Sequence, residues 1–151
     1  GGFCLPKDTK IMHESILNMK LFKNSTSIKR YAKINYDLNN EIINFYSNFI
    51  LEKTKTLDRI LFLGIAFKGL PETNDTRDSV GVKIIKKISK HRKNINFYDL
   101  IVKKFLNKNA NNKEVLTKKY NLIVILNNHP EYKKIAKKIE AKNNQIIDFW
   151  K

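Results

Sequence analysis

The 151-residue chain has room for one ordinary domain with an appendage, and its 42% hydrophobic content is enough to form a core. Its formal net charge is +16, but only four of the 30 basic residues are arginines and the lysines are spread over every segment. We therefore expect general solvated basicity and no nucleic-acid partner. A single cysteine excludes an internal disulfide, and no apolar run approaches the length of a membrane span, so we expect a soluble cytoplasmic protein with no membrane association.

The first nine residues place the only cysteine, Cys4, after a pair of glycines and close to Lys7 and Asp8. Glycines allow a ligand to approach the main chain closely, and a nearby cation favours the thiolate, which is the nucleophilic form of cysteine. A lone cysteine is more often an inert buried residue. Taken alone, this segment therefore leaves both interpretations of Cys4 open.

Two helices are expected next. Asp8 or Thr9 can cap a helix that runs to about Phe22, and Ser27 can cap a second helix over 28–53, which contains neither glycine nor proline. Apolar residues recur on one face of the second helix: Tyr31, Leu38, Ile42, Phe45 and Phe49. Further apolar residues widen this stripe, so the helix either packs against a partner subunit or a missing domain, or buries one face on its own domain.

From residue 59 onward the pattern changes to an alternation of strands and helices. Near-continuous apolar runs predict strands at 59–66, 94–98, 121–126 and 145–149. Helical segments are expected between them: about a dozen residues after Ser79, which can cap that helix, then 101–110, 114–120 and 131–142. We therefore predict an α/β fold with an open parallel Rossmann-like sheet and flanking helices, preceded by a long helix.

The loop after the first strand, 67–79, is far longer than a normal connection from strand to helix. It lacks the G-x-G-x-x-G dinucleotide fingerprint, but Lys68 and Arg77 are placed to meet phosphate oxygens beyond the strand ends. Alternatively, Arg77 pairs with a neighbouring aspartate and Lys68 is solvated, and the loop alone favours neither interpretation. After the third strand, His129 either faces a nucleotide base or ends the strand, and we favour the second.

Two segments together resemble a known family. The first, Gly1-Gly2-Phe3-Cys4-Leu5-Pro6-Lys7-Asp8, resembles the catalytic cysteine loop of the UDP-glucose/GDP-mannose dehydrogenase family. The second, 64–69 with 74–79, resembles the signature that opens the C-terminal domain of that family. The resemblance implies a catalytic-loop and central helical region over 1–56, which forms the dimer interface through the 28–53 helix, and a C-terminal nucleotide-sugar-binding domain over 57–151.

Members of this family use two NAD molecules in succession to oxidise the C6 alcohol of a nucleotide sugar to a carboxylate. The resemblance makes Cys4 the nucleophile that traps the aldehyde as a thiohemiacetal, from which a second hydride transfer gives a thioester. Covalent capture divides a four-electron oxidation into two easier steps. Asp8 matches the aspartate that positions or activates the hydrolytic water.

The resemblance also implies binding roles. Phe67 and Lys68 match residues that hold the sugar nucleotide, with Lys68 near its phosphates, and Gly1 matches a glycine whose backbone lies against the substrate. The residues implied on the NAD side are Cys4, Leu5, Pro6, Lys7 and Arg77. No metal site is expected.

Two departures from the family pattern stand out. The N-terminal NAD-binding domain, with its acid/base lysine and glutamate, is missing, so we expect the chain to be inactive alone. At 147–151, where many relatives carry a substrate-binding arginine, the chain has none. UDP-glucose is the first choice of substrate, with UDP-N-acetylhexosamine and GDP-mannose as alternatives. The competing functions are a non-catalytic basic nucleic-acid-binding module and a dimerisation unit.

Overall fold

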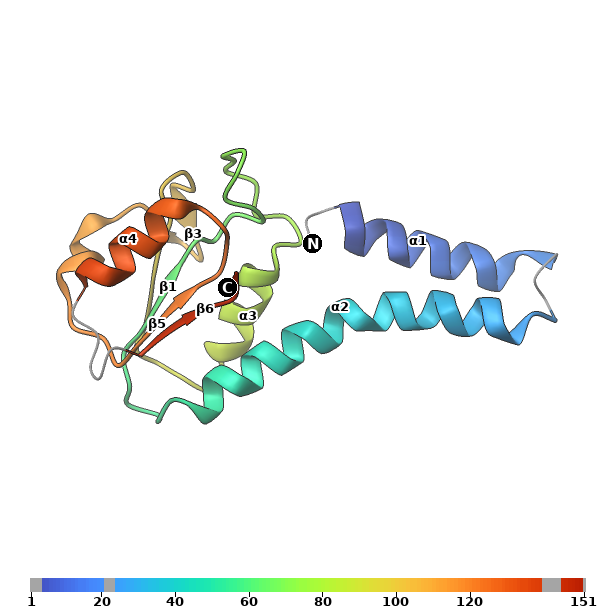
Figure 1. The fold of residues 1–151 in the computed structure, drawn as a ribbon, viewed down its shortest axis with the longest axis horizontal. Coiled ribbons are helices and arrows are strands. Elements are labelled where there is room, and N and C mark those ends of the chain that lie inside the picture. The colour runs from blue at the N-terminus through green and yellow to red at the C-terminus, as the bar shows by residue number, and fades with distance from the viewer. Residues whose placement is uncertain (1–3, 21–23, 140–144, 151) are drawn as a thin grey trace.

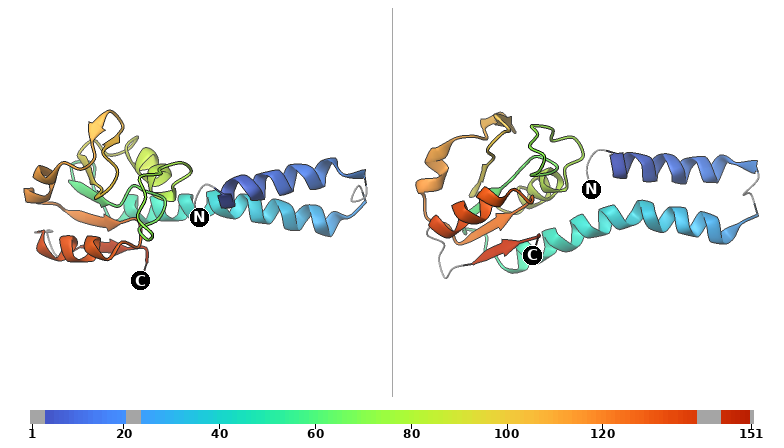
Figure 2. Two further views of the ribbon diagram at one scale, coloured as in Figure 1. Left: turned by 90° about the horizontal axis from the view of Figure 1, so that it is seen from above. Right: turned by 45° about the horizontal axis from the view of Figure 1, so that its top comes forward.

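The computed structural model describes residues 4–20, 24–139 and 145–150, and it contains a helical hairpin joined to an α/β domain (Figure 1). Helix α1 (Cys4–Asn18) and helix α2 (Thr26–Glu52) form the hairpin and run side by side in all views (Figures 1 and 2). The last turns of α2 pack against the α/β domain, so one long helix connects the two regions. No helix in the described ranges has the length and apolar content needed to cross a membrane.

The α/β domain is built on a four-stranded sheet in which every strand pair is parallel. Its strands are β1 (Ile60–Leu63), β2 (Ile95–Tyr98), β5 (Leu122–Ile125) and β6 (Ile146–Asp148), arranged in the order β2-β1-β5-β6. Ile60 lies opposite Ile95 on one side and Leu122 on the other. This topology confirms the predicted open parallel sheet.

Helices cover both faces of the sheet, so the two central strands, β1 and β5, are fully buried. Helix α3 (Val80–Ile88) and the end of α2 pack on one face, around Phe62 and Val124. On the other face, helix α4 (Pro130–Lys138) and the 3₁₀ helix η2 (Lys113–Thr117) pack around Leu61 and Ile123.

The helix predicted over 101–110 is wrong. This segment forms a small antiparallel hairpin of β3 (Lys104–Phe105) and β4 (Lys108–Asn109). Its two-residue turn places Leu106 and Asn107 at φ 47° and 58°, a left-handed conformation that asparagine tolerates and that a helix does not contain. The hairpin lets Phe105 meet Phe97 edge to face, with ring centroids 5.0 Å apart, so packing against β2 overrides the helical spacing of the apolar residues.

Helix boundaries also differ from expectation. Helix α1 begins at Cys4, so the segment expected to be a loop before Asp8 is already helical from that residue. Helix α2 begins at Thr26 with Ser25 as its N-cap in place of Ser27, and the Ser25 side chain makes no capping hydrogen bond. Ser79, in contrast, caps α3 as predicted, by accepting a hydrogen bond from the backbone N–H of Val82.

Candidate functional site

The candidate site lies where β1 and β5 end. Strand β1 lies between β2 and β5. The chain adds β2 on one side of β1 and then crosses to add β5 on the other side, so the order of strands reverses between β1 and β5. Ligands of open α/β sheets bind beyond the carboxyl ends of the strands at such a point. The loop 64–79, which we call the β1–α3 loop, leaves β1 here, and Asn127 to His129 leave β5 beside it.

A buried carboxylate fixes the start of the β1–α3 loop. Asp99, at the end of β2, accepts hydrogen bonds from the backbone N–H groups of Ile65 at 2.6 Å and Ala66 at 3.1 Å. Its second oxygen accepts from Ile101 and Val102, both at 2.8 Å. Four backbone donors satisfy the buried charge and fix the two turns to each other. Sequence reasoning missed Asp99; the available signal was a carboxylate directly after a buried strand.

The far end of the loop is attached to its beginning. The Ser79 hydroxyl donates to the carbonyl oxygen of Ile65 at 2.8 Å while it caps α3, so one side chain connects both ends of the loop. Within the loop, the backbone N–H of Phe67 donates to the carbonyl oxygen of Asp75 at 3.0 Å. The loop is therefore folded back on itself despite its length.

The turn after β5 supports the loop from the other side. The backbone N–H of Gly69 donates to Asn128 Oδ1 at 2.9 Å, and a Cβ on Gly69 would lie against the backbone of His129. Gly64 has φ 86°, and a Cβ there would come within 2.6 Å of the Asn127 side chain. Glycine is therefore required at Gly69 because two backbones approach each other closely, and at Gly64 because of the positive φ and the adjacent Asn127 side chain.

His129 is a structural residue in this arrangement. Its Nδ1 accepts from the backbone N–H of Glu131 at 3.2 Å and so caps α4, while Nε2 lies 2.9 Å from Glu72 Oε1 in the β1–α3 loop. An acceptor at Nδ1 places the ring proton of the neutral histidine on Nε2, where it faces Glu72. The side chain is nearly buried. These contacts match the preferred interpretation, in which His129 ends the strand.

Lys68 and Phe67 lie together on the loop just beyond β1. The Lys68 ammonium is 5.2 Å from the centroid of the Phe67 ring, a cation–π distance, and both residues are half-buried. Across the described part of the chain, Lys68 Nζ makes no ion pair. Within the described residues, the loop thus presents a half-buried cation whose charge no carboxylate neutralises.

Arg77 pairs with Asp75 of the same loop. Its Nε lies 3.0 and 3.1 Å from the two carboxylate oxygens of Asp75, and its Nη2 lies 2.8 Å from the second of them. The side-chain and backbone hydrogen bonds from Arg77 lower the pKa of Asp75 to about 2. This geometry is the second of the two arrangements that the sequence allowed for Arg77. Phe67, Lys68 and Arg77 are therefore brought onto one loop, with Arg77 held by a carboxylate and Lys68 without one.

The predicted catalytic segment lies at the start of α1. Gly1 lies outside the described residues, as do the side chains of Cys4, Leu5 and Pro6. Lys7 and Asp8 are on the first turns of α1, with Lys7 Nζ 3.4 Å from Asp8 Oδ1. Figures 1 and 2 show that this end of α1 faces the α/β domain on the side of the β1–α3 loop, whereas the opposite end of the hairpin is remote from it.

Comparison with solved structures places this arrangement among known folds. A UDP-D-ManNAc dehydrogenase from Pyrococcus horikoshii superposes with a TM-score of 0.62 and 28% identity over 98% of this chain and 34% of its own. A GDP-mannose dehydrogenase from Pseudomonas aeruginosa gives a TM-score of 0.67 at 18% identity over 98% of this chain and 35% of its own. The UDP-N-acetyl-mannosamine dehydrogenase Cap5O from S. aureus gives 0.55 at 16% identity, with coverages of 88% and 35%.

The chain spans about a third of the length of these solved chains. A search of curated proteins gives no match. At the level of sequence families, residues 61–151 match the UDP-binding domain of the UDP-glucose/GDP-mannose dehydrogenase family. The match covers more than half of the chain and includes the sheet, the β1–α3 loop and the turn after β5. The chain therefore belongs to the UDP-glucose/GDP-mannose dehydrogenase family.

Proposed function

We propose that this chain is the nucleotide-sugar-binding and thiol-bearing part of a cytoplasmic, NAD-dependent nucleotide-sugar 6-dehydrogenase. The observation that carries the proposal is Lys68, a half-buried ammonium without a carboxylate partner in the described structure, held at the carboxyl ends of β1 and β5. A diphosphate that binds there gains a charge-assisted hydrogen bond from Lys68, and the Phe67 ring limits the positions the lysine can take. Gly1, at the start of the thiol segment, would contribute its backbone to the same substrate.

Cys4 would supply the covalent chemistry. Its thiol adds across the C6 aldehyde to give a thiohemiacetal. Loss of a hydride from that carbon and of the proton from its hydroxyl gives a thioester, and water then releases the carboxylate and restores the thiol. Asp8 would orient the hydrolytic water. The start of α1 lies on the side of the β1–α3 loop, which suits a reaction that joins the two segments (Figure 2).

NAD supplies the hydride acceptor in this scheme. The α/β domain of this chain is a poor candidate for holding most of that cofactor, because β1 is followed by the β1–α3 loop and not by a G-x-G-x-x-G turn. Residues 4–7 and Arg77 would therefore contact only one side of NAD. Because Arg77 already pairs with Asp75, contact with the cofactor would require the guanidinium to share or exchange that partner.

The sugar is the least determined part of the proposal. UDP-glucose is our first choice from the Pro6-Lys7-Asp8 segment, and UDP-N-acetylhexosamine is the alternative favoured by the 28% identity to the Pyrococcus horikoshii UDP-D-ManNAc dehydrogenase. Comparing the affinities of UDP, UDP-glucose, a UDP-N-acetylhexosamine and GDP-mannose for the same chain distinguishes the branches.

A thermal-shift titration tests the binding step without requiring turnover. UDP should raise the melting temperature of the chain, and Lys68→Ala should remove most of the rise. Lys137→Ala, on the exposed face of α4, is the matched control and should leave the rise unchanged. A chain that shows no shift with any nucleotide or nucleotide sugar, or an equal shift in both variants, would overturn the assigned role of Lys68.

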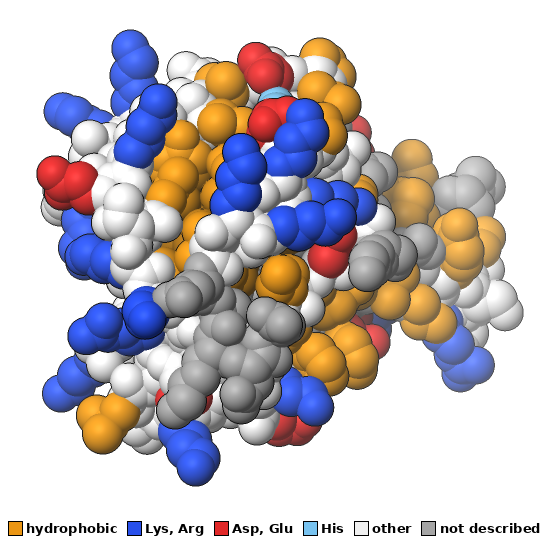
Figure 3. All heavy atoms as spheres, turned by 60° about the vertical axis from the view of Figure 1, so that its left-hand side comes forward, with side chains coloured by type: hydrophobic (Ala, Val, Ile, Leu, Met, Phe, Trp, Pro, Cys, Tyr) orange, Lys and Arg blue, Asp and Glu red, His pale blue; other side chains and the backbone are white. Residues whose placement is uncertain are grey.

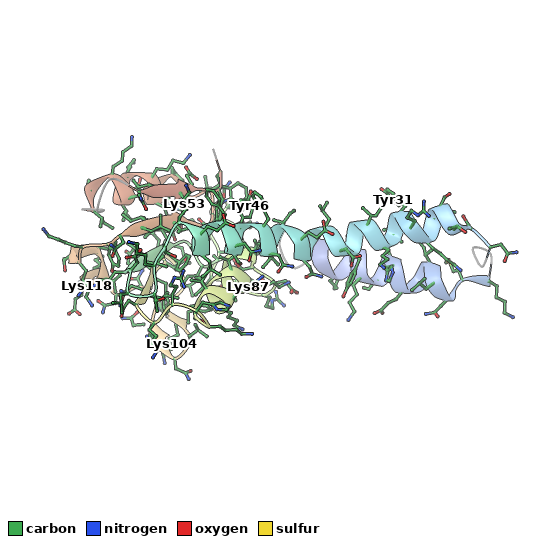
Figure 4. All side chains as sticks on the ribbon, turned by 90° about the horizontal axis from the view of Figure 1, so that it is seen from below. Tyr31, Tyr46, Lys53, Lys87, Lys104 and Lys118 are labelled. Carbon is green, nitrogen blue, oxygen red and sulfur yellow. The ribbon has the colours of Figure 1, made fainter. Side chains whose placement is uncertain are left out.

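We further propose that α2 forms a homodimer. Large apolar side chains are exposed along it at spacings of three and four residues: Tyr31, Ile34, Leu38, Ile42, Phe45 and Phe49. Figure 4 shows Tyr31 on the part of α2 that extends away from the α/β domain. Such a stripe is typical of a helix that packs against another helix.

A further inference from the structure

Strand β2 forms one edge of the sheet. It is the first strand in the order β2-β1-β5-β6, so among the described residues it has a neighbouring strand on one side only. In the register of β2 with β1, Ile60 lies opposite Ile95, and the Ile60 N–H donates to the Asn94 carbonyl. The N–H and C=O groups of Ile95 and Phe97 therefore point away from β1. These outward groups have no hydrogen-bond partner in the described structure.

A groove runs along this free edge. It has a volume of about 350 Å³ and is lined on one side by 95–97 of β2 and on the other by the β3–β4 hairpin and η2, including Lys108 and Lys118. A second hollow of about 640 Å³ adjoins it, shares Lys108 and Asn109 with it, and adds Lys103 and Lys104. The β2 edge is therefore accessible from a concave surface.

Lysines line both hollows, and no aspartate or glutamate is among the described lining residues. The carboxylate on η2 is that of Glu114, which accepts a hydrogen bond from the Asn112 side chain at 3.3 Å. Segment 100–113 contains no aspartate or glutamate. In the described part of the protein, none of its lysines forms an ion pair, and neither does Lys118. Lysine and arginine side chains are spread over the end of the α/β domain opposite the helical hairpin (Figure 3), and Figure 4 shows Lys104 and Lys118 on the α/β domain away from that hairpin.

We propose that the free edge of β2 binds an extended, acidic peptide segment of a partner protein, which adds to the sheet as a further strand. A peptide backbone offers the alternating donors and acceptors that Ile95 and Phe97 lack, and carboxylates on the peptide would meet Lys108 and Lys118. A second copy of this chain is a poor occupant of this edge, since Lys108 and Lys118 of one copy would face the same lysines of the other.

Two other roles of the lysines along this edge predict binding results that differ from those of the proposal. Lysines can simply protect an edge strand from aggregation, in which case no acidic strand binds. They can also form a general surface for polyanions, in which case a nucleic acid binds as well as a peptide and the β2 backbone plays no part. The test must therefore separate charge from strand pairing.

The probe is a fluorescein-labelled heptapeptide of alternating valine and glutamate, Val-Glu-Val-Glu-Val-Glu-Val, titrated with the 151-residue chain at low salt and followed by fluorescence anisotropy. The same peptide with every backbone nitrogen methylated keeps its carboxylates but cannot donate to a strand. A twelve-residue single-stranded oligothymidylate is the polyanion comparison.

The charge-reversal variant is Lys108→Glu with Lys118→Glu, both exposed residues. The matched control is Lys20→Glu with Lys33→Glu, which makes the same change in net charge on the exposed surface of the helical hairpin. Amide hydrogen exchange of Ile95 and Phe97 reports whether the bound peptide pairs with β2.

We expect the unmodified peptide to bind and to slow amide exchange at Ile95 and Phe97. Its affinity should fall at least tenfold when its backbone is methylated, and at least tenfold when the protein carries Lys108→Glu with Lys118→Glu. The Lys20/Lys33 variant should bind within about twofold of the wild type. Absence of binding, equal binding of the methylated peptide, unchanged exchange at Ile95 and Phe97, or tighter binding of the oligothymidylate with the same lysine dependence would each overturn the proposal.

Discussion

The α/β domain buries its large apolar side chains, whereas the helical hairpin exposes several of its own. In the domain, β1 is covered on both faces and Phe62 is 0% exposed, whereas on α2 Phe45 is 67% exposed and Tyr31 is 65% exposed. The core of the domain is closed with the help of the last turns of α2, while the rest of the hairpin has one seam between α1 and α2 and leaves an apolar stripe uncovered. The fully buried apolar side chains are therefore concentrated in the domain, and the exposed stripe on α2 is the surface that we propose for dimerisation.

The sharpest test of this contrast is the same substitution made in each region. Phe62→Ala should lower the free energy of unfolding by about 3–5 kcal/mol, because it leaves a cavity between packed layers. Phe45→Ala should change it by less than about 0.5 kcal/mol under conditions where the chain is monomeric. Urea denaturation followed by circular dichroism measures both. Similar losses for the two variants would mean that the face of α2 carrying Phe45 is part of a folded core.

The contrast also explains which elements the sequence predicted well. The two central strands, β1 and β5, follow from apolar runs of the right length, because a parallel strand buried on both faces leaves an unambiguous pattern. The edge strands β2 and β6 are only partly buried and follow from shorter apolar segments. The helix over 101–110 was wrong because its apolar residues have helical spacing but are buried by folding back onto Phe97. Nothing local to that segment reports this tertiary contact, although Asn107 is a residue type that tolerates a left-handed turn.

The second prediction concerns the contact between the β1–α3 loop and the turn after β5. In Gly69→Ala, the new Cβ would meet the backbone N of His129 and lie 2.6 Å from its Cα, and neither atom can rotate away. We expect a loss of about 1–3 kcal/mol in stability, together with weaker UDP binding, because the loop must move.

Gly81→Ala is the matched control for this substitution. Gly81 lies within α3, and the nearest contact for a Cβ there is Leu126 Cβ at 3.1 Å, which a shift of a few tenths of an ångström relieves. Alanine is also the better helix former, so its net effect should be close to zero. Equal denaturation midpoints for the two variants would contradict the close approach at Gly69.

The candidate site was only partly visible in the sequence, for a physical reason. Lys68 and Arg77 could be named from the loop alone, since cations beyond a strand end are typical of phosphate sites. The residues that hold the loop in place, Asp99 and Asn128, lie 33 to 59 residues from their partners in the loop and act through backbone N–H groups. A backbone donor has no signature in the sequence, so the position of Asp99 could be noticed, but its partners in the loop emerge only from the fold.

The third prediction addresses assembly through α2. Phe45→Asp should weaken self-association at least tenfold, because it places a charge in the centre of the apolar stripe. Leu57→Asp is the matched control, since Leu57 is 82% exposed but lies in the turn after α2. Sedimentation velocity over a concentration series measures both. A wild-type chain that stays monomeric at high concentration, or equal weakening by the two variants, would contradict a dimer through this stripe.

The smallest expected effect is electrostatic and lies within the β1–α3 loop. Hydrogen bonds from the Arg77 side chain and backbone lower the pKa of Asp75 to about 2, below the ordinary aspartate value of about 3.9. Because the pKa is lower in the folded state, the Arg77–Asp75 pair contributes fully above about pH 4, and its contribution is lost as the pH falls toward 2. The Arg77 side chain is 69% exposed, so salt should weaken the pair.

In an NMR titration, Arg77→Ala should move the Asp75 midpoint upward, toward the ordinary value. Arg30→Ala, on α2 of the helical hairpin, should leave it unchanged. If Arg77→Ala leaves the Asp75 midpoint unchanged, the Arg77–Asp75 pair is rarely formed in solution. The Arg77 guanidinium would then be as available to phosphate as the Lys68 ammonium.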